Sequence, residues 1–158
     1  MSIYYKGKKI TPHFTTAEYD MDGSEDVYMN SDTLVFIQCI EEFRVWLQRP
    51  MYVTSWYRSY KVNKKVGGIS SSNHLTGTAM DWYCKGIKYP DKFVKYVKEW
   101  NSICKRHGKV AEAGLYTWGF HFGIQNGSQA TANGNRLFHW DSRTGTQINK
   151  PFRELNLL

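Results

Sequence analysis

The sequence predicts an α+β fold, with two or three helices packed on a small central antiparallel sheet. Apolar side chains recur at helical spacing in two long stretches, one between Ser31 and Pro50 and one between Pro90 and Gly108. Short runs of β-branched and aromatic residues separate and follow these stretches. With 158 residues the chain has the length of one domain, so we expect a single domain over residues 1–158.

Capping signals place the helices of the first half. Thr15 and Glu18 have the spacing of a capping box, which predicts a short helical turn near the N-terminus. Ser31 or Asp32 can cap the first long helix, and Pro50 ends it. The second long helix is expected to begin at a proline, a favourable residue for the first helical position.

Five short strands are expected, at 51–56, 78–83, 113–116, 120–125 and 136–141. Between them, segments 63–72 and 126–135 are rich in glycine, serine or asparagine, and we expect them to be loops. The last three strands follow one another at the end of the chain, which indicates an antiparallel meander.

The net charge and the aromatic content limit the classes of possible binding partner but do not select one class. The chain has 21 Lys and Arg residues against 14 Asp and Glu residues, a formal net charge of +7, and 16% aromatic residues. Such a surface can bind nucleic acid, an anionic membrane or an anionic polymer such as the bacterial cell wall. No stretch resembles a nucleic-acid-binding motif, so no nucleic acid is expected as a partner. No window approaches the ~18 apolar residues of a membrane span.

The number and spacing of the cysteines argue against a disulfide-bonded scaffold and against a zinc ribbon. Cys39, Cys84 and Cys104 are odd in number and widely spaced, without a Cys-x-x-Cys pair, so they form neither a disulfide framework nor a zinc ribbon. We expect them to be reduced and at least partly buried. The N-terminal residues lack the apolar core of a secretion signal, and we expect synthesis in the cytoplasm without a signal peptide.

The segment 72–81 carries the strongest chemical signal. It places His74 seven residues before Asp81, with Gly77 between them as a point where the chain can double back. Imidazole and carboxylate are both zinc ligands, and a catalytic zinc needs a third protein ligand and one position for water. As spacing alone, such a pair is more often a surface contact than a metal site.

The same segment, Ser-x-His-x-x-Gly-x-Ala-x-Asp, resembles a motif of the D-alanyl-D-alanine carboxypeptidase-like zinc peptidases. This family includes vancomycin-resistance dipeptidases, cell-wall endopeptidases and phage endolysins. Residues 54–59 resemble its Thr-Ser-Gly-Tyr-Arg-Ser segment, and residues 62–68 resemble its Val-Asn-x-x-Val-Gly-Gly continuation. The similarity extends over residues 13–143, and it implies the hedgehog/D-Ala-D-Ala peptidase-like form of the α+β fold.

The resemblance implies roles for four residues. His74 and Asp81 match the first two ligands of a Zn²⁺ ion. Arg58 matches an arginine near the substrate, where it would bind a carboxylate or stabilise charge on the scissile carbonyl. Ser72 matches the motif serine and is a candidate substrate-binding residue. The plainer alternatives are a solvated charge for Arg58 and a loop hydroxyl for Ser72.

The third zinc ligand has two candidates. His121 follows a Gly-x-Tyr segment and a short turn, an arrangement similar to the ligand-bearing strand of the family. His139 lies in a Phe-His-Trp-Asp segment that resembles a His-x-Asp ligand motif, and equally the strand that follows it. We favour His121, which would leave His139 as a packed strand residue.

A general base is not identified by the sequence. Many relatives place a carboxylate three residues before the third ligand, and here Trp118 or Arg136 occupies that position. If His121 is the ligand, Gly123 also replaces the aspartate of the His-x-Asp motif. Glu112 and His139 remain as catalytic candidates, because both could flank the site from neighbouring strands.

The resemblance implies zinc-dependent hydrolysis of amide bonds in peptidoglycan peptide stems or cross-bridges, as an endopeptidase or a carboxypeptidase. The protein would be a monomer that acts on the bacterial cell wall with peptidoglycan peptide as its partner, as a phage lysin or a tail-associated hydrolase. The alternative is a non-catalytic descendant that serves as a cell-wall-binding or virion structural module. The missing carboxylate motivates this alternative.

Overall fold

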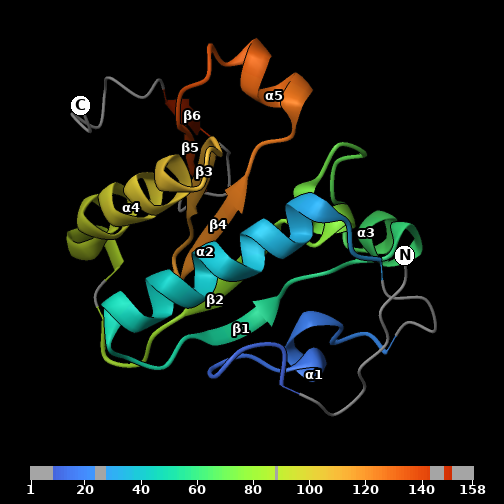
Figure 1. Cartoon of the computed structure of the whole chain (residues 1–158), viewed down its shortest axis with the longest axis horizontal. Helices are drawn as coiled ribbons and strands as arrows, with labels where there is room; N and C mark the ends of the chain where they lie inside the picture. The colour runs from blue at the N-terminus through green and yellow to red at the C-terminus, as the bar shows by residue number, and fades with distance from the viewer. Residues whose placement is uncertain (1–8, 24–27, 88, 143–147, 151–158) are drawn as a thin grey trace.

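The computed structural model describes residues 9–23, 28–87, 89–142 and 148–150. The helices are α1 (Thr16–Tyr19), α2 (Ser31–Leu47), α3 (Tyr60–Lys65), α4 (Tyr89–Arg106) and α5 (Gly127–Ala132), with a 3-10 turn η1 (Asn73–Thr76). The strands are β1 (Tyr52–Ser55), β2 (Ala79–Tyr83), β3 (Ala111–Leu115), β4 (Phe120–Ile124), β5 (Phe138–Asp141) and β6 (Ile148–Lys150). Figure 1 shows these elements along the chain.

The six strands form one sheet in the order β1-β2-β4-β3-β5-β6. All neighbouring pairs are antiparallel except β3 and β5, which run parallel. The α+β class is therefore confirmed, and the sheet is mixed rather than wholly antiparallel. The parallel pair arises from the connection between β4 and β5, which contains α5. This connection crosses β3, so that β5 lies on the side of β3 opposite to β4.

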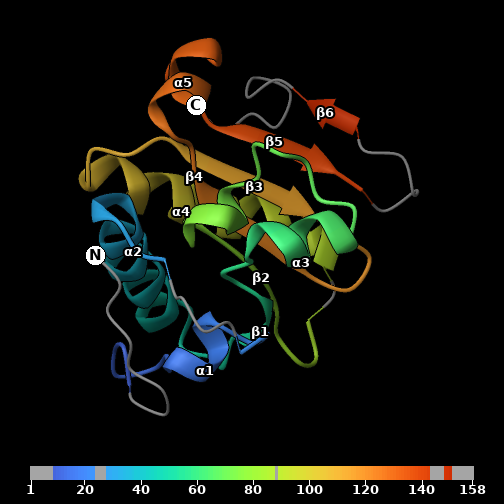
Figure 2. The same ribbon diagram turned by 90° about the vertical axis from the view of Figure 1, so that its right-hand side faces the viewer.

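The hydrophobic core lies between the sheet and the two long helices, α2 and α4. Figures 1 and 2 show these helices together on one face of the sheet. On β4, the ring of Phe122 lies 4.9 Å from Phe43 of α2 and 5.1 Å from Trp100 of α4. Because side chains alternate along a strand, the neighbours of Phe122 on β4 face the opposite side of the sheet. That opposite side carries the polar residues described below.

Local signals explain where the main elements begin and turn. α2 is capped by Asn30, one residue before the two expected caps, and Asn30 forms a reciprocal capping box with Thr33. The expected capping box at Thr15 and Glu18 is present at the start of α1. At Gly77 the chain takes a left-handed conformation with φ of +65°, which ends η1 and turns the chain into β2. The reversal expected between His74 and Asp81 is therefore formed.

Four elements were not expected from the sequence, and the 3-10 turn η1 is one of them. α3 overlaps one expected loop, and α5 lies inside the other. Both are six-residue helices started by side-chain caps, Ser59 for α3 and Asn126 for α5, and neither is long enough to show an apolar period. β6 pairs with β5 at the edge of the sheet. In the part of the chain that the structure describes, no helix has the length and apolar character needed to cross a membrane.

The three cysteines match their prediction. Cys39, Cys84 and Cys104 are free thiols, and all three are buried. Burial raises the pKa of the Cys84 thiol to about 11, so it stays protonated near neutral pH. They act as small apolar groups in the core and take no part in the polar site.

Candidate active site

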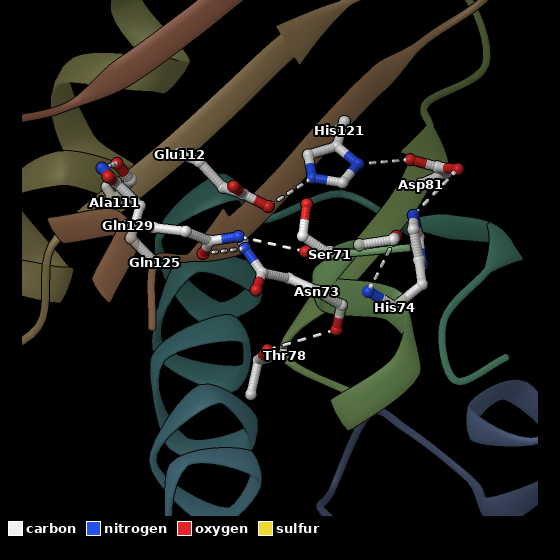
Figure 3. A network of polar contacts seen from close by, with 12 residues as sticks. Ser71, Asn73, His74, Thr78, Asp81, Ala111, Glu112, His121, Gln125 and Gln129 are labelled. Atoms are coloured by element: carbon white, nitrogen blue, oxygen red, sulfur yellow. Dashed lines mark hydrogen bonds and ion pairs between the residues drawn. The ribbon is translucent and has the colours of Figure 1, made fainter. Parts of the chain in front are cut away.

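The polar site is built on the face of the sheet that points away from α2 and α4. In the β2–β4 ladder, Asp81 lies directly opposite His121, so both side chains project from the same face. His74 lies in η1, just before the turn into β2. Figure 3 shows the three side chains pointing toward one another.

The donor atoms of His74, Asp81 and His121 all lie within 4.8 Å of one another. Oδ1 of Asp81 is 2.8 Å from Nδ1 of His121, and Oδ2 of Asp81 is 3.3 Å from Nε2 of His74. All three residues are buried. Two imidazoles and one carboxylate therefore converge on one point from two strands and a turn, a donor set that suits Zn²⁺.

Each histidine also binds an acceptor through its other ring nitrogen. Nδ1 of His74 donates to the backbone oxygen of Trp56 at 2.6 Å, and the other ring nitrogen, Nε2, faces Asp81. Nε2 of His121 lies 2.8 Å from Oε1 of Glu112. Metal-binding histidines are usually oriented in this way, by a carbonyl or carboxylate on the nitrogen away from the metal. The partners of these two rings thus fit a metal centre.

Electrostatics in the site favour a cation. Burial acts to raise the pKa of Asp81, but His74 and His121 beside it outweigh burial and hold that pKa far below its usual range. Burial acts to lower the pKa of His121, but the carboxylates of Asp81 and Glu112 raise it to about 9. The carboxylates of Asp81 and Glu112 thus flank His121 in a buried place, where they stabilise positive charge.

The comparison with protein families agrees with this donor set. The family model described as Peptidase M15 matches residues 12–111, nearly two thirds of the chain, and the match includes His74 and Asp81. The chain belongs to the M15 family of zinc peptidases. This family includes D-Ala-D-Ala carboxypeptidases, and membership implies a metallopeptidase. A comparison with curated proteins finds no match.

The matched region stops before the third donor of the M15 site. His121 lies ten residues past the end of the match, and its place beside His74 and Asp81 comes from the strand pairing. His139 is buried on β5, where it pairs with Ala113, whereas the site-facing positions of β3 are Glu112 and Gly114. Its side chain therefore projects from the opposite face of the sheet. The structure does not bring His139 to the site, either as a ligand or as a base.

Arg58 lies at the site and contacts one of the M15 donor residues. Its Nη2 donates to Oδ2 of Asp81 at 3.0 Å, and its Nε donates to Oγ of Ser55 at 2.8 Å. Its backbone N–H donates to the carbonyl oxygen of His74 at 2.9 Å. Arg58 is thus held by both ends of the His-Asp motif, and its guanidinium lines the cleft described next.

A cleft of about 370 Å³ opens over the metal-binding group of this M15 peptidase. Residues that line it include Arg58, Ser72, His74, Glu112, Tyr116 and Trp140. The Trp140 ring lies 4.6 Å from the ring of His121 and packs over Gly114, where a Cβ atom would clash with it. Ser72 caps η1, and its hydroxyl accepts from the backbone N–H of His74 at 3.3 Å. The predicted residues Arg58, Ser72 and Glu112 therefore share one cleft.

One wall of the cleft was missed by the sequence analysis. Gln129 of α5 accepts a hydrogen bond from Nδ2 of Asn73 at 3.0 Å and donates to the backbone oxygen of Ser71 at 3.0 Å. Figure 3 shows this network beside His74. The capping box of Asn126 and Gln129 was the available signal, because it marks a helix start inside the segment expected to be a loop.

Proposed function

We propose that this M15 protein is a zinc-dependent peptidase that hydrolyses amide bonds in the peptide stems or cross-bridges of peptidoglycan. The observation that carries the proposal is the convergence of His74, Asp81 and His121, with donor atoms within 4.8 Å of one another at the base of a cleft. Zinc bound by these residues would supply a nucleophilic water at neutral pH and a Lewis acid for the scissile carbonyl.

The residues around the donors have separate tasks in this reaction. Arg58 presents its guanidinium to the cleft while its Nη2 is bonded to Asp81, so its charge can stabilise the negative charge that develops on the carbonyl oxygen. Glu112 is the one carboxylate among the described residues that line the cleft, and it is the remaining candidate for the proton acceptor. Ser72 fixes the backbone of His74 and borders the space for substrate.

The surface chemistry supports a cell-wall substrate. At the turn between β3 and β4, the half-exposed ring of Trp118 stacks on Tyr116 at 5.0 Å with an interplanar angle of 5°, and Tyr116 lines the cleft. A flat aromatic pair at the mouth of a cleft suits a sugar ring or an extended peptide. The formal net charge of +7 favours approach to an anionic wall. As part of the same proposal, the protein acts on the bacterial wall as a phage lysin or a tail-associated hydrolase.

The test is cleavage of purified peptidoglycan by the zinc-loaded protein, with soluble products analysed by mass spectrometry. We expect new amino termini within the peptide stems or cross-bridges, loss of cleavage with a chelator, and loss of cleavage in His74→Ala. Release of single terminal residues would identify a carboxypeptidase, and release of larger fragments an endopeptidase. A protein that binds one zinc and sediments with the wall but cuts nothing would overturn the proposal in favour of a non-catalytic binding module.

A further inference from the structure

Glu112 and Gly123 form a cross-strand pair next to the metal-binding group. They lie directly opposite each other in the β3–β4 ladder, on the same face as His121. The Glu112 side chain lies across Gly123, so that a Cβ atom at position 123 would clash with Oε1 of Glu112. The backbone at Gly123 does not have a positive φ, so conformational freedom does not explain a glycine here. The space it leaves is filled by the carboxylate of Glu112.

This carboxylate reaches His121 through that space. Oε1 of Glu112 is 2.8 Å from Nε2 of His121, and both residues are buried. The other ring nitrogen, Nδ1, is 2.8 Å from Oδ1 of Asp81 and faces the group that contains His74. The two nitrogens of His121 are therefore in contact with two different carboxylates, one on each side of the ring. A carboxylate only accepts hydrogen bonds, so each ring nitrogen bonds its carboxylate through a proton. If a metal takes the place of the proton on Nδ1, the proton that remains is the one on Nε2, next to Glu112.

We propose that Glu112 is a positioning residue that fixes the tautomer and orientation of His121, and that Gly123 is required because any side chain would displace Glu112. With Nε2 donating to Glu112, the Nδ1 lone pair is directed toward Asp81 and His74, where the metal is proposed to bind. The inference rests on the proposed metal centre and adds two residues that are not ligands. Carboxylates that orient ligating histidines in this way typically change metal affinity by ~10–100-fold when removed.

Two substitutions at position 112 separate this role from direct proton transfer. The carboxylate oxygen that contacts His121 is occupied by the ring N–H, and Glu112 is held on the far side of the ring from Asp81. Glutamine at position 112 keeps an acceptor oxygen for Nε2 but cannot accept a proton from water. Alanine at position 112 removes both abilities. The two substitutions therefore give different results if Glu112 acts through His121.

The experiment measures zinc affinity by competition with a chromogenic chelator in wild type, Glu112→Ala, Glu112→Gln and Gly123→Ala. We expect Glu112→Ala and Gly123→Ala to bind zinc ~10–100-fold more weakly, and Glu112→Gln to stay within a few-fold of wild type. Gly127→Ala is the matched control, because a Cβ atom there meets nothing within 4 Å, and it should not change the affinity. Thermal unfolding with excess chelator checks that each variant is folded.

A spectroscopic measurement tests the tautomer itself. Long-range ¹H–¹⁵N correlation on the zinc-loaded wild type should show the His121 proton on Nε2. A proton on Nδ1, or wild-type zinc affinity in both Glu112→Ala and Gly123→Ala, would overturn the inference. Wild type that binds no zinc would instead overturn the proposed metal centre, so the two failures are distinguishable.

Discussion

At the scale of single residues, Asp81 is the common partner of the site. Its carboxylate contacts Arg58, His74 and His121, each at a distance of 3.3 Å or less. If any one of these partners is removed, a buried charge loses its compensating partner, and this strongly destabilises the folded protein. The donors therefore depend on one another, and their substitutions should not be additive.

The first prediction concerns the ligands. His74→Ala and His121→Ala should each lose most of the one zinc ion expected in wild type, because a three-donor site cannot hold zinc firmly with two donors. His139→Ala should keep its zinc, since its side chain lies on the other face of the sheet. Elemental analysis of the purified, folded proteins measures the stoichiometry. His13→Ala, at a surface pair with Glu41, is the control.

The second prediction concerns pH and the stability of protein freed of metal with a chelator. The pKa of His121 is raised to about 9 in the fold, above its ordinary value of 6.5. Its ionised form therefore contributes stability that is fully present below about pH 6.5 and is lost as the pH rises through about 9, an effect on the order of 1–3 kcal/mol. Urea unfolding at pH 6.5 and pH 9.5 measures it. If His121→Gln shows the same loss over this range, another group is responsible.

At the scale of elements, β3 and β4 contribute residues both to the hydrophobic core and to the candidate active site. On β4, Phe120 and Phe122 pack under the helices, while His121 between them faces the cleft. The turn that joins the two strands carries the Trp118 ring, which stacks on Tyr116 of the cleft wall. Residues of one hairpin thus fold the domain, hold the donor and border the space for substrate.

The third prediction is structural. Phe122→Ala should lower the free energy of unfolding by about 3–5 kcal/mol, because the fully buried ring contacts aromatic rings of both long helices and leaves a cavity when it is removed. Chemical denaturation with excess chelator gives the value without a contribution from metal. A loss below 1 kcal/mol would mean that the helices do not depend on this ring.

The fourth prediction concerns the aromatic pair at the cleft. Trp118→Ala should weaken sedimentation with insoluble peptidoglycan several-fold while leaving cleavage of a short soluble peptide nearly unchanged, because Trp118 is not among the residues that line the cleft over the donors. Trp46→Ala is the matched control, since Trp46 is also a partly exposed tryptophan but lies on α2, which covers the other face of the sheet. Equal wall binding in both variants would show that Trp118 does not bind the wall by stacking on a sugar or a peptide.

At the scale of the whole molecule, the sequence predicts what depends on neighbours along the chain. The two long helices have clear apolar periods and stop signals, and the turn at Gly77 follows from its place between His74 and Asp81. The α+β class follows from these elements and the short strands. Two of the three donors lie within one motif, and the resemblance of that local segment to the zinc peptidases was enough to find them.

What the sequence could not predict depends on strand pairing over long distances. The choice between His121 and His139 is decided by which face of the sheet each one occupies, and that face is set by register with strands far away in the chain. The contact of Glu112 with His121 likewise requires the β3–β4 register and the missing side chain at Gly123. The parallel pairing of β3 with β5 depends on the path of the segment that contains α5.

The alternation along β4 has a consequence for how this protein tolerates change. All five of its residues are buried, and they divide between packing under the helices and lining the reaction face. A saturation library over β4 should therefore contain almost no neutral variants, whereas the exposed residues Thr117 and Trp118 next to it should accept many substitutions in a screen for folding alone. Within this hairpin, natural diversification of substrate preference would then be confined to the tip.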